Sequence, residues 1–253
     1  MNTAHPDHHR PPAHQRPPGS HHRGRSYRLL LTICIGVLVS FTLPAPWSRL
    51  SSLGYLLLGG VMLRAFSPVH SSTGRGVMPK LLYRISGVAA LASSLIWYLT
   101  PVELKGTGIP LLGLWTLFSV WSAIRLIEAL AQEREVGSDV MRGALAGYLM
   151  LGLSGGLLCS ALETIVPGSF ESSAVGAPGQ PLSGPVWGLN FVRLNYYAFV
   201  TLTTTGYGDV APLTPLAQMI SVAIAVAGTT YLTVVLGLLI SRFSHDDHRR
   251  SGG

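Results

Sequence analysis

Long hydrophobic blocks separated by short polar stretches make up most of the chain. A helix needs roughly 20 apolar residues to cross the hydrocarbon core of a bilayer, and several blocks approach that length. In chain order the blocks are residues 29–43, 50–66, 81–99, 109–127, 142–165 and 213–240. The pattern predicts six membrane-crossing helices, of which the first is short and the second is marginal in length.

Composition and charge support a membrane protein. Of the 253 residues, 48% are hydrophobic and 11% are charged, whereas about a quarter of the residues of a soluble domain are charged. With both termini in the cytoplasm, all of the 18 Lys and Arg residues except Arg49, Lys105 and Arg193 fall on the inner side. This bias follows the positive-inside rule. It predicts a multi-pass protein of the cell membrane, and it explains the net charge of +7 without a nucleic-acid partner.

Polar segments lie at both ends of the chain. Residues 1–27 are rich in Pro, His, Arg and Gly and hold six of the nine histidines, so they are predicted to be a disordered cytoplasmic tail. Metal binding or pH sensing by these histidines is the alternative. Residues 244–253 form a second, short cytoplasmic tail. Cys34 and Cys159 lie inside apolar blocks, which favours buried thiols over a disulfide or a metal site.

One short polar stretch lies between the last two apolar blocks. Residues 187–203 are too short and too polar to span a bilayer, and the glycine-rich segment 203–209 follows them. Non-helical backbone at membrane depth is tolerated only where it is buried in protein or lines a water-filled cavity. The chain is therefore predicted to be an all-α membrane protein with six transmembrane helices and a re-entrant pore helix between the fifth and sixth.

The sequence Thr204-Thr205-Gly206-Tyr207-Gly208 resembles the selectivity filter of potassium channels, TVGYG, with Thr in place of Val. The resemblance extends over residues 142–243 as helix, pore helix, filter and helix. It implies a homotetramer in which K⁺ binds the backbone carbonyls of Thr204, Thr205, Gly206 and Tyr207 and the Thr204 hydroxyl. Such a backbone needs positive φ angles, which Gly206 and Gly208 adopt without a Cβ penalty.

The same resemblance assigns roles around the filter. Tyr196 and Tyr197 are candidates for an aromatic cuff, and the Thr203 hydroxyl is expected to face the cavity. Asp209 at the outer mouth would either form a cation-attracting ring or hydrogen-bond to the pore helix, and the resemblance favours the second. Some family members carry a carboxylate where this chain has Val200.

The last apolar block holds candidates for a gate. Gly228 is either a hinge or a packing glycine. Thr229 would face the cavity, and Leu232, Leu236 and Ile240 recur at helical spacing on the same face. A ring of such apolar side chains can close a pore by dewetting. The alternative is a stripe that faces lipid or a neighbouring helix.

Residues 28–130 and 131–243 are predicted to be two domains. The first has the topology of a voltage sensor without its charges, because Arg125 is the only Arg or Lys in its fourth helix. Steep voltage dependence needs several such charges, so we expect it to be weak. The second is the pore domain.

The leading hypothesis is a potassium-selective channel with K⁺ as permeant ion, the bilayer as environment and no cofactor. A poorly selective cation channel is the alternative within this class. A non-conducting membrane subunit or a membrane enzyme is the alternative from other classes. An enzyme is not expected, because the acidic residues of the apolar blocks are isolated and most histidines lie in the tail.

Overall fold

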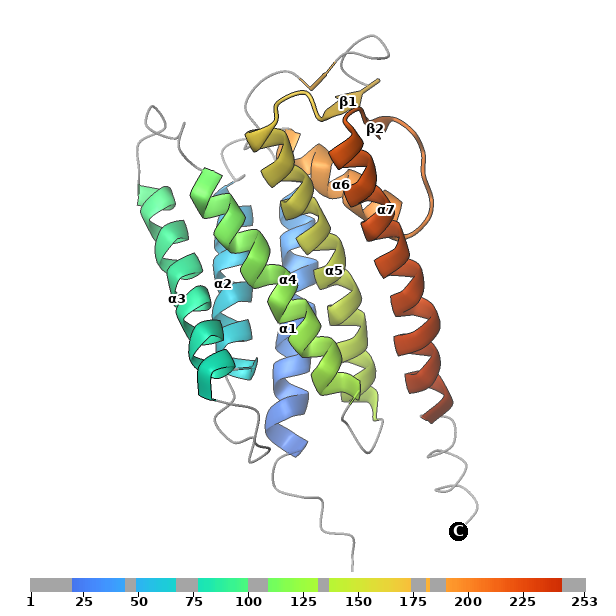
Figure 1. Cartoon of the computed structure of the whole chain (residues 1–253). Helices are drawn as coiled ribbons and strands as arrows, with labels where there is room; N and C mark the ends of the chain where they lie inside the picture. The colour runs from blue at the N-terminus through green and yellow to red at the C-terminus, as the bar shows by residue number, and fades with distance from the viewer. Residues whose placement is uncertain are drawn as a thin grey trace, which may run out of the picture.

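The computed structural model describes residues 20–43, 49–66, 77–99, 109–131, 137–173, 181–182 and 190–242, and these are mostly helical (Figure 1). The helices are α1 (Ser20–Ser40), α2 (Arg49–Phe66), α3 (Val77–Leu99), α4 (Ile109–Ala131), α5 (Ser138–Ile165), α6 (Phe191–Leu202) and α7 (Pro215–Thr230). A π-helical segment, η4 (Tyr231–Leu236), continues α7, and the helix ends at Arg242.

Several helices extend beyond the apolar blocks that predicted them. The first begins at Ser20 instead of residue 29, the third at Val77 instead of 81, and the fourth ends at Ala131 instead of 127. Backbone hydrogen bonds continue through polar residues, whereas the apolar pattern marks only the part of a helix that leaves water. Predictions for residues 1–19 and 244–253 lie outside the described residues.

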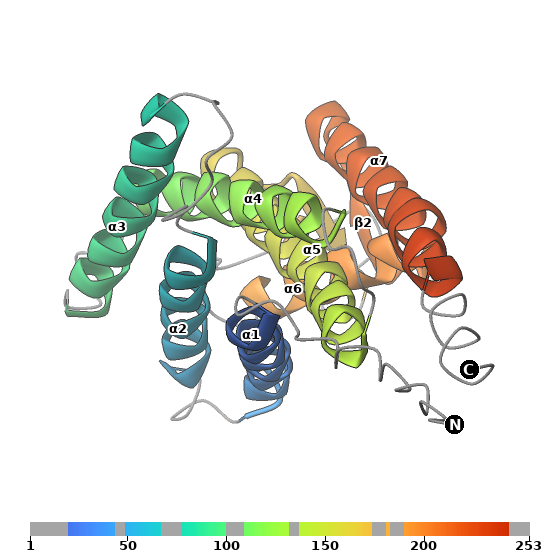
Figure 2. The same ribbon diagram turned by 90° about the horizontal axis from the view of Figure 1, so that it is seen from below.

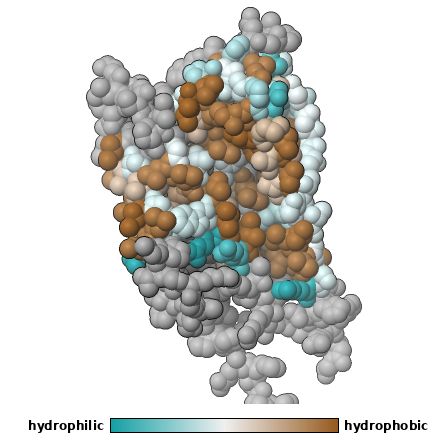
Figure 3. Space-filling model, viewed as in Figure 1, coloured by the Kyte–Doolittle hydropathy of each residue, from teal (hydrophilic) through white to brown (hydrophobic). Residues whose placement is uncertain are grey.

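Within the part of the chain that the structure describes, three helices are long and apolar enough to cross a membrane. They are Gly113–Leu130 within α4, Ser138–Ile165, and Pro215–Arg242; Leu53–Arg64 and Leu81–Ser93 are shorter apolar helices. Figure 3 shows apolar residues over the middle of the visible face and hydrophilic ones mainly toward its ends. These features support a membrane protein, and the count of six spans stays a prediction.

Helix α5 lies at the centre of the molecule. It packs against α1, α4, α6 and α7. In Figure 2, α1 lies between α2 and α5, and α3 lies at the edge, where it packs against α2 and α4. One core cluster contains residues from each of the helices α1 to α5. Its members Leu30, Phe118 and Leu153 are fully buried. A second cluster lies around α6 and holds Phe170, Leu194 and Leu202.

A short β pairing corrects the expectation of an all-α fold. Strand β1 (Phe170–Ser172) pairs antiparallel with β2 (Val210–Pro212), so that Glu171 lies opposite Ala211. The stretch 167–185 is rich in Gly, Pro and Ser and has no strand periodicity, so no strand was predicted there. The pairing arises because the segment after α5 meets the segment after residues 203–208, the candidate filter, and their backbone groups satisfy one another.

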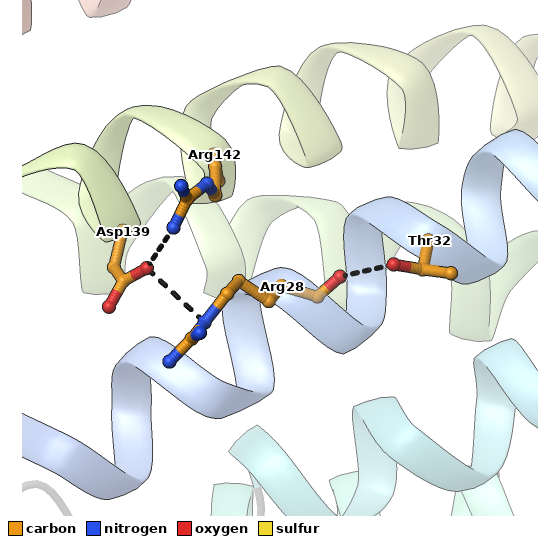
Figure 4. A network of polar contacts seen from close by, with 4 residues as sticks. All are labelled: Arg28, Thr32, Asp139 and Arg142. Carbon is orange, nitrogen blue, oxygen red and sulfur yellow. Dashed lines mark hydrogen bonds and ion pairs between the residues drawn. The ribbon is translucent and has the colours of Figure 1, made fainter.

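A charged cluster joins α1 to the beginning of α5 (Figure 4). Oδ1 of Asp139 lies 3.3 Å from Nε of Arg28 and 2.6 Å from an Nη atom of Arg142. All three side chains are at least one-third exposed. Asp139 is in the first turn of α5, where a negative charge also interacts favourably with the helix dipole.

Candidate functional site: a carbonyl-lined loop after α6

The backbone after α6 alternates in handedness. Thr204, Gly206 and Gly208 have φ angles of 60°, 59° and 77°, and Thr205 and Tyr207 between them have negative φ. The left-handed backbone expected at the two glycines is present. Left-handed Thr204 was not expected, because a β-branched residue rarely adopts this conformation. Such strain concentrates at functional sites.

The N–H groups of this segment point toward the end of α6. Thr204 N donates to Thr201 O at 3.0 Å, and Val200 O accepts from Thr205 N at 2.9 Å and from Gly206 N at 3.3 Å. In a trans peptide the C=O points opposite to the following N–H. The carbonyls of residues 203, 204 and 205 therefore point away from α6, on the exposed side of the segment. A row of carbonyl oxygens on one side can replace the water around a cation.

The threonine hydroxyls are held near the same helix end. Thr203 Oγ1 donates to Phe199 O at 2.8 Å and lies 2.9 Å from Thr205 Oγ1. Thr203 is exposed, but its hydroxyl proton is directed to the backbone of α6. The expected contribution of this hydroxyl to a cavity stays a prediction.

The two tyrosines of α6 point to different partners. Tyr197 is buried; its hydroxyl donates to Ser221 Oγ of α7 at 2.5 Å, and its ring meets that of Phe170 at 5.4 Å. The Tyr196 side chain, in contrast, is exposed, and Asp209 lies near it. Both alternatives for Asp209, the cation-attracting ring and the hydrogen bond to the helix before it, stay predictions. Tyr197 packs within its own chain, and the cuff stays a prediction.

A buried carboxylate organises the turn before β1. Glu163 is 4% exposed; Oε1 accepts from Gly168 N at 2.8 Å, and Oε2 accepts from Phe170 N at 3.0 Å. The turn leads into β1, and Ser173 N donates to the carbonyl of Asp209 at 3.0 Å. Glu163 thus supports the strand that contacts the end of the filter segment. An acidic residue within an apolar block is the sequence signal that could have indicated this role.

The candidate gate residues of α7 and η4 lie in different surroundings. Gly228 is buried, and a Cβ there would contact the carbonyl oxygen of Leu202, so this glycine permits close packing against α6. Thr229, Leu232 and Ile240 are exposed, whereas Leu236 packs partly against the core cluster. The prediction that these residues share one face assumed α-helical spacing throughout. The π-helical segment η4 interrupts that spacing.

Tyr231 at the start of η4 was missed by sequence reasoning. It is buried and donates its hydroxyl to Ala144 O of α5 at 2.6 Å.

In α4, the guanidinium of Arg125 lies over the ring of Tyr83 of α3, 5.6 Å from its centre. The roles of Gly228, Leu232, Leu236 and Ile240 in gating stay predictions, as does weak voltage dependence.

Comparison with known proteins shows what this part of the chain is similar to. An ion channel family model matches residues 169–245, which include β1, α6, the filter segment and α7. The predicted resemblance to potassium channels is confirmed. No significant match to a solved structure was found.

Three similar proteins illustrate the family. A rice (Oryza sativa subsp. japonica) two pore potassium channel c is 30% identical over 97 residues, 38% of this chain and 17% of that protein. A voltage-gated potassium channel of Aeropyrum pernix is 42% identical over 48 residues, 19% of this chain and 16% of that protein. The human potassium voltage-gated channel subfamily A member 7 is 36% identical over 58 residues, which are 23% of this chain and 13% of that protein. The matches therefore span less than a fifth of each relative.

Proposed function

We propose that this chain is one subunit of a potassium-selective channel. Four copies would surround one pore, and dehydrated K⁺ would pass between the carbonyls of Thr204, Thr205, Gly206 and Tyr207. Each chain supplies one filter segment, and coordination by carbonyls around an axis needs several copies, which is why a homotetramer is proposed. All six long helices would cross the cell membrane with both termini in the cytoplasm, as the charge bias favours.

The observation that carries this proposal is the orientation of the filter backbone. Its N–H groups are bonded to the end of α6, and its alternating φ angles keep successive peptide units turned in the same sense. The carbonyl oxygens of residues 203–205 then face away from α6, and in the proposed filter those of Gly206 and Tyr207 would continue the row. The negative end of the α6 dipole lies beside this row and favours a cation.

Potassium flux into liposomes that contain the purified protein tests the proposal. Wild type should pass K⁺ and discriminate strongly against Na⁺. Flux of both ions at similar rates would favour the poorly selective cation channel. No flux of either ion would favour a non-conducting subunit.

Gly206→Ala is the variant that connects flux to the filter. Within one chain a Cβ at Gly206 meets nothing within 4 Å, so the penalty comes from placing it at positive φ. Thr204 already places one Cβ at positive φ. Ala at position 206 would place a second one there, and this conformation costs about 1–2 kcal/mol for each chain. We expect K⁺ flux to fall by at least about tenfold in a tetramer. Gly60→Ala is the matched control, because Gly60 is helical and equally open; loss of flux in both variants would contradict the assignment.

A further inference from the structure

A buried hydrogen bond connects α2 to the pore helix α6. The Tyr55 hydroxyl donates to Oδ1 of Asn195 at 3.1 Å, across 140 residues of sequence. Asn195 is fully buried, and Tyr55 is 7% exposed. The amide of Asn195 also donates from Nδ2 to Phe191 O at 2.9 Å. Donor and acceptor of the amide thus each have a partner, which fixes its orientation.

Aromatic contacts surround this hydrogen bond. The ring of Phe191, at the start of α6, lies edge-on to Tyr55 of α2 and to Phe41, the residue after α1, at 6.0 Å in both cases. The ring of Trp115 of α4 also lies edge-on to Tyr55, with 6.3 Å between the ring centres. Edge-to-face pairs of this kind are favourable and directional. Residues of α2 and α4 and the residue following α1 thereby fix the first turns of α6.

Helix α5 contacts the same part of α6 through glycines. A Cβ at Gly156 would contact the amide of Asn195, and one at Gly152 would contact the ring of Phe199. The pore helix therefore lies directly on the backbone of α5, and Tyr55 donates to the same amide oxygen of Asn195 that faces Gly156. Rotation of α6 about its axis would have to break one of these contacts.

The filter depends on the orientation of α6. Asn195 lies about one turn before Phe199, Val200 and Thr201, whose carbonyls accept the N–H groups of residues 203 to 206. Any rotation of the helix would displace these acceptors. The filter carbonyls would then turn as well, because each peptide unit is rigid.

We propose that Tyr55 is a positioning residue for the filter, and that α2, supported by α4 and the end of α1, sets the orientation of the pore helix within its own chain. This role for the first four helices needs no voltage sensing. The effect on conduction rests on the proposed function, whereas the effect on backbone order does not.

Tyr55→Phe tests the proposal, with Tyr83→Phe as the matched control. Each change removes one hydroxyl from a buried tyrosine of the first four helices. The Tyr83 hydroxyl contacts Ser122 Oγ and Met62 O, so its partners lie in α4 and α2 and not in α6. A merely structural hydroxyl should behave alike at both positions.

The readout that does not require conduction is hydrogen exchange of the amides of residues 203–206, followed by mass spectrometry. Loss of one buried hydrogen bond should accelerate their exchange by about fivefold in Tyr55→Phe. Tyr83→Phe should leave these amides as in wild type. Unchanged exchange in Tyr55→Phe, or equal acceleration in both variants, would overturn the proposal.

The second readout is ion discrimination in liposomes. Tyr55→Phe should lower the ratio of K⁺ to Na⁺ flux, whereas Tyr83→Phe should keep the wild-type ratio. If the amides of residues 203–206 exchange faster in Tyr55→Phe but the K⁺ to Na⁺ flux ratio stays at the wild-type value, the proposal that Tyr55 positions the filter carbonyls would be overturned. A wild-type protein without K⁺ flux would instead refute the proposed function, and the exchange comparison would still decide whether Tyr55 orders the loop.

Discussion

The two ends of α5 show how differently the two ends of the molecule are held. At the filter end, where β1 and β2 lie, Glu163 is buried and accepts only backbone N–H groups. At the opposite end, Asp139 is partly exposed and pairs with the side chains of Arg28 and Arg142. The first carboxylate fixes irregular backbone, whereas the second pairs with side chains that remain hydrated.

The glycines of the last helix show the same contrast. Gly228, near the filter end, lies against the carbonyl of Leu202. Gly237, near the opposite end, has open space where a side chain would be. Substitutions at the filter end should therefore be costly because backbone atoms cannot move away, and those at the opposite end should be tolerated.

Gly228→Ala should give the largest effect. Its Cβ would overlap the Leu202 carbonyl, and we expect a loss of about 3 kcal/mol in the free energy of unfolding. Gly237→Ala should be neutral or stabilising by up to about 1 kcal/mol, because Ala is the better helix former. Unfolding of both purified variants in detergent measures the difference. Equal stability of the two variants would favour a flexible hinge at Gly228.

Glu163→Gln should give the next largest effect. One carboxylate oxygen becomes an NH₂ group that faces the N–H of Gly168 or Phe170, so one buried donor loses its acceptor. The expected loss is about 2 kcal/mol. Glu128→Gln, on an exposed position of α4, should stay within about 0.5 kcal/mol of wild type. A fully stable Glu163→Gln protein would show that the turn before β1 does not depend on the carboxylate.

The sequence was most informative where local chemistry decides the structure. Positive φ at Gly206 and Gly208 follows from the motif, since glycine adopts that backbone region at little cost. The helices followed from the length of the apolar blocks, because a long apolar segment in a membrane must satisfy its own backbone. Left-handed Thr204 was not predictable, because its own conformational preference opposes it and only its surroundings compensate.

The rest depends on contacts between distant residues. Tyr55 lies in an apolar block and Asn195 in the short polar stretch 187–203, and nothing local indicates that they pair. The two strands are three residues each, too short for a detectable alternation, and they exist because residues 170 and 212 meet in space. The π-helical turn at Tyr231 likewise coincides with a contact to α5 that no periodicity predicts.

Asp139→Asn should give the smallest effect and thereby tests the other half of the comparison. The carboxylate shares two guanidinium partners, but all three groups are partly exposed, so water screens the attraction and about 0.5 kcal/mol is expected. The difference from wild type should shrink further in 1 M salt, where the screening length is about 3 Å. Glu163→Gln should lose the same stability at either salt concentration, because its partners are buried amides. A loss above about 2 kcal/mol for Asp139→Asn, independent of salt, would show that the two ends of α5 are held in the same way.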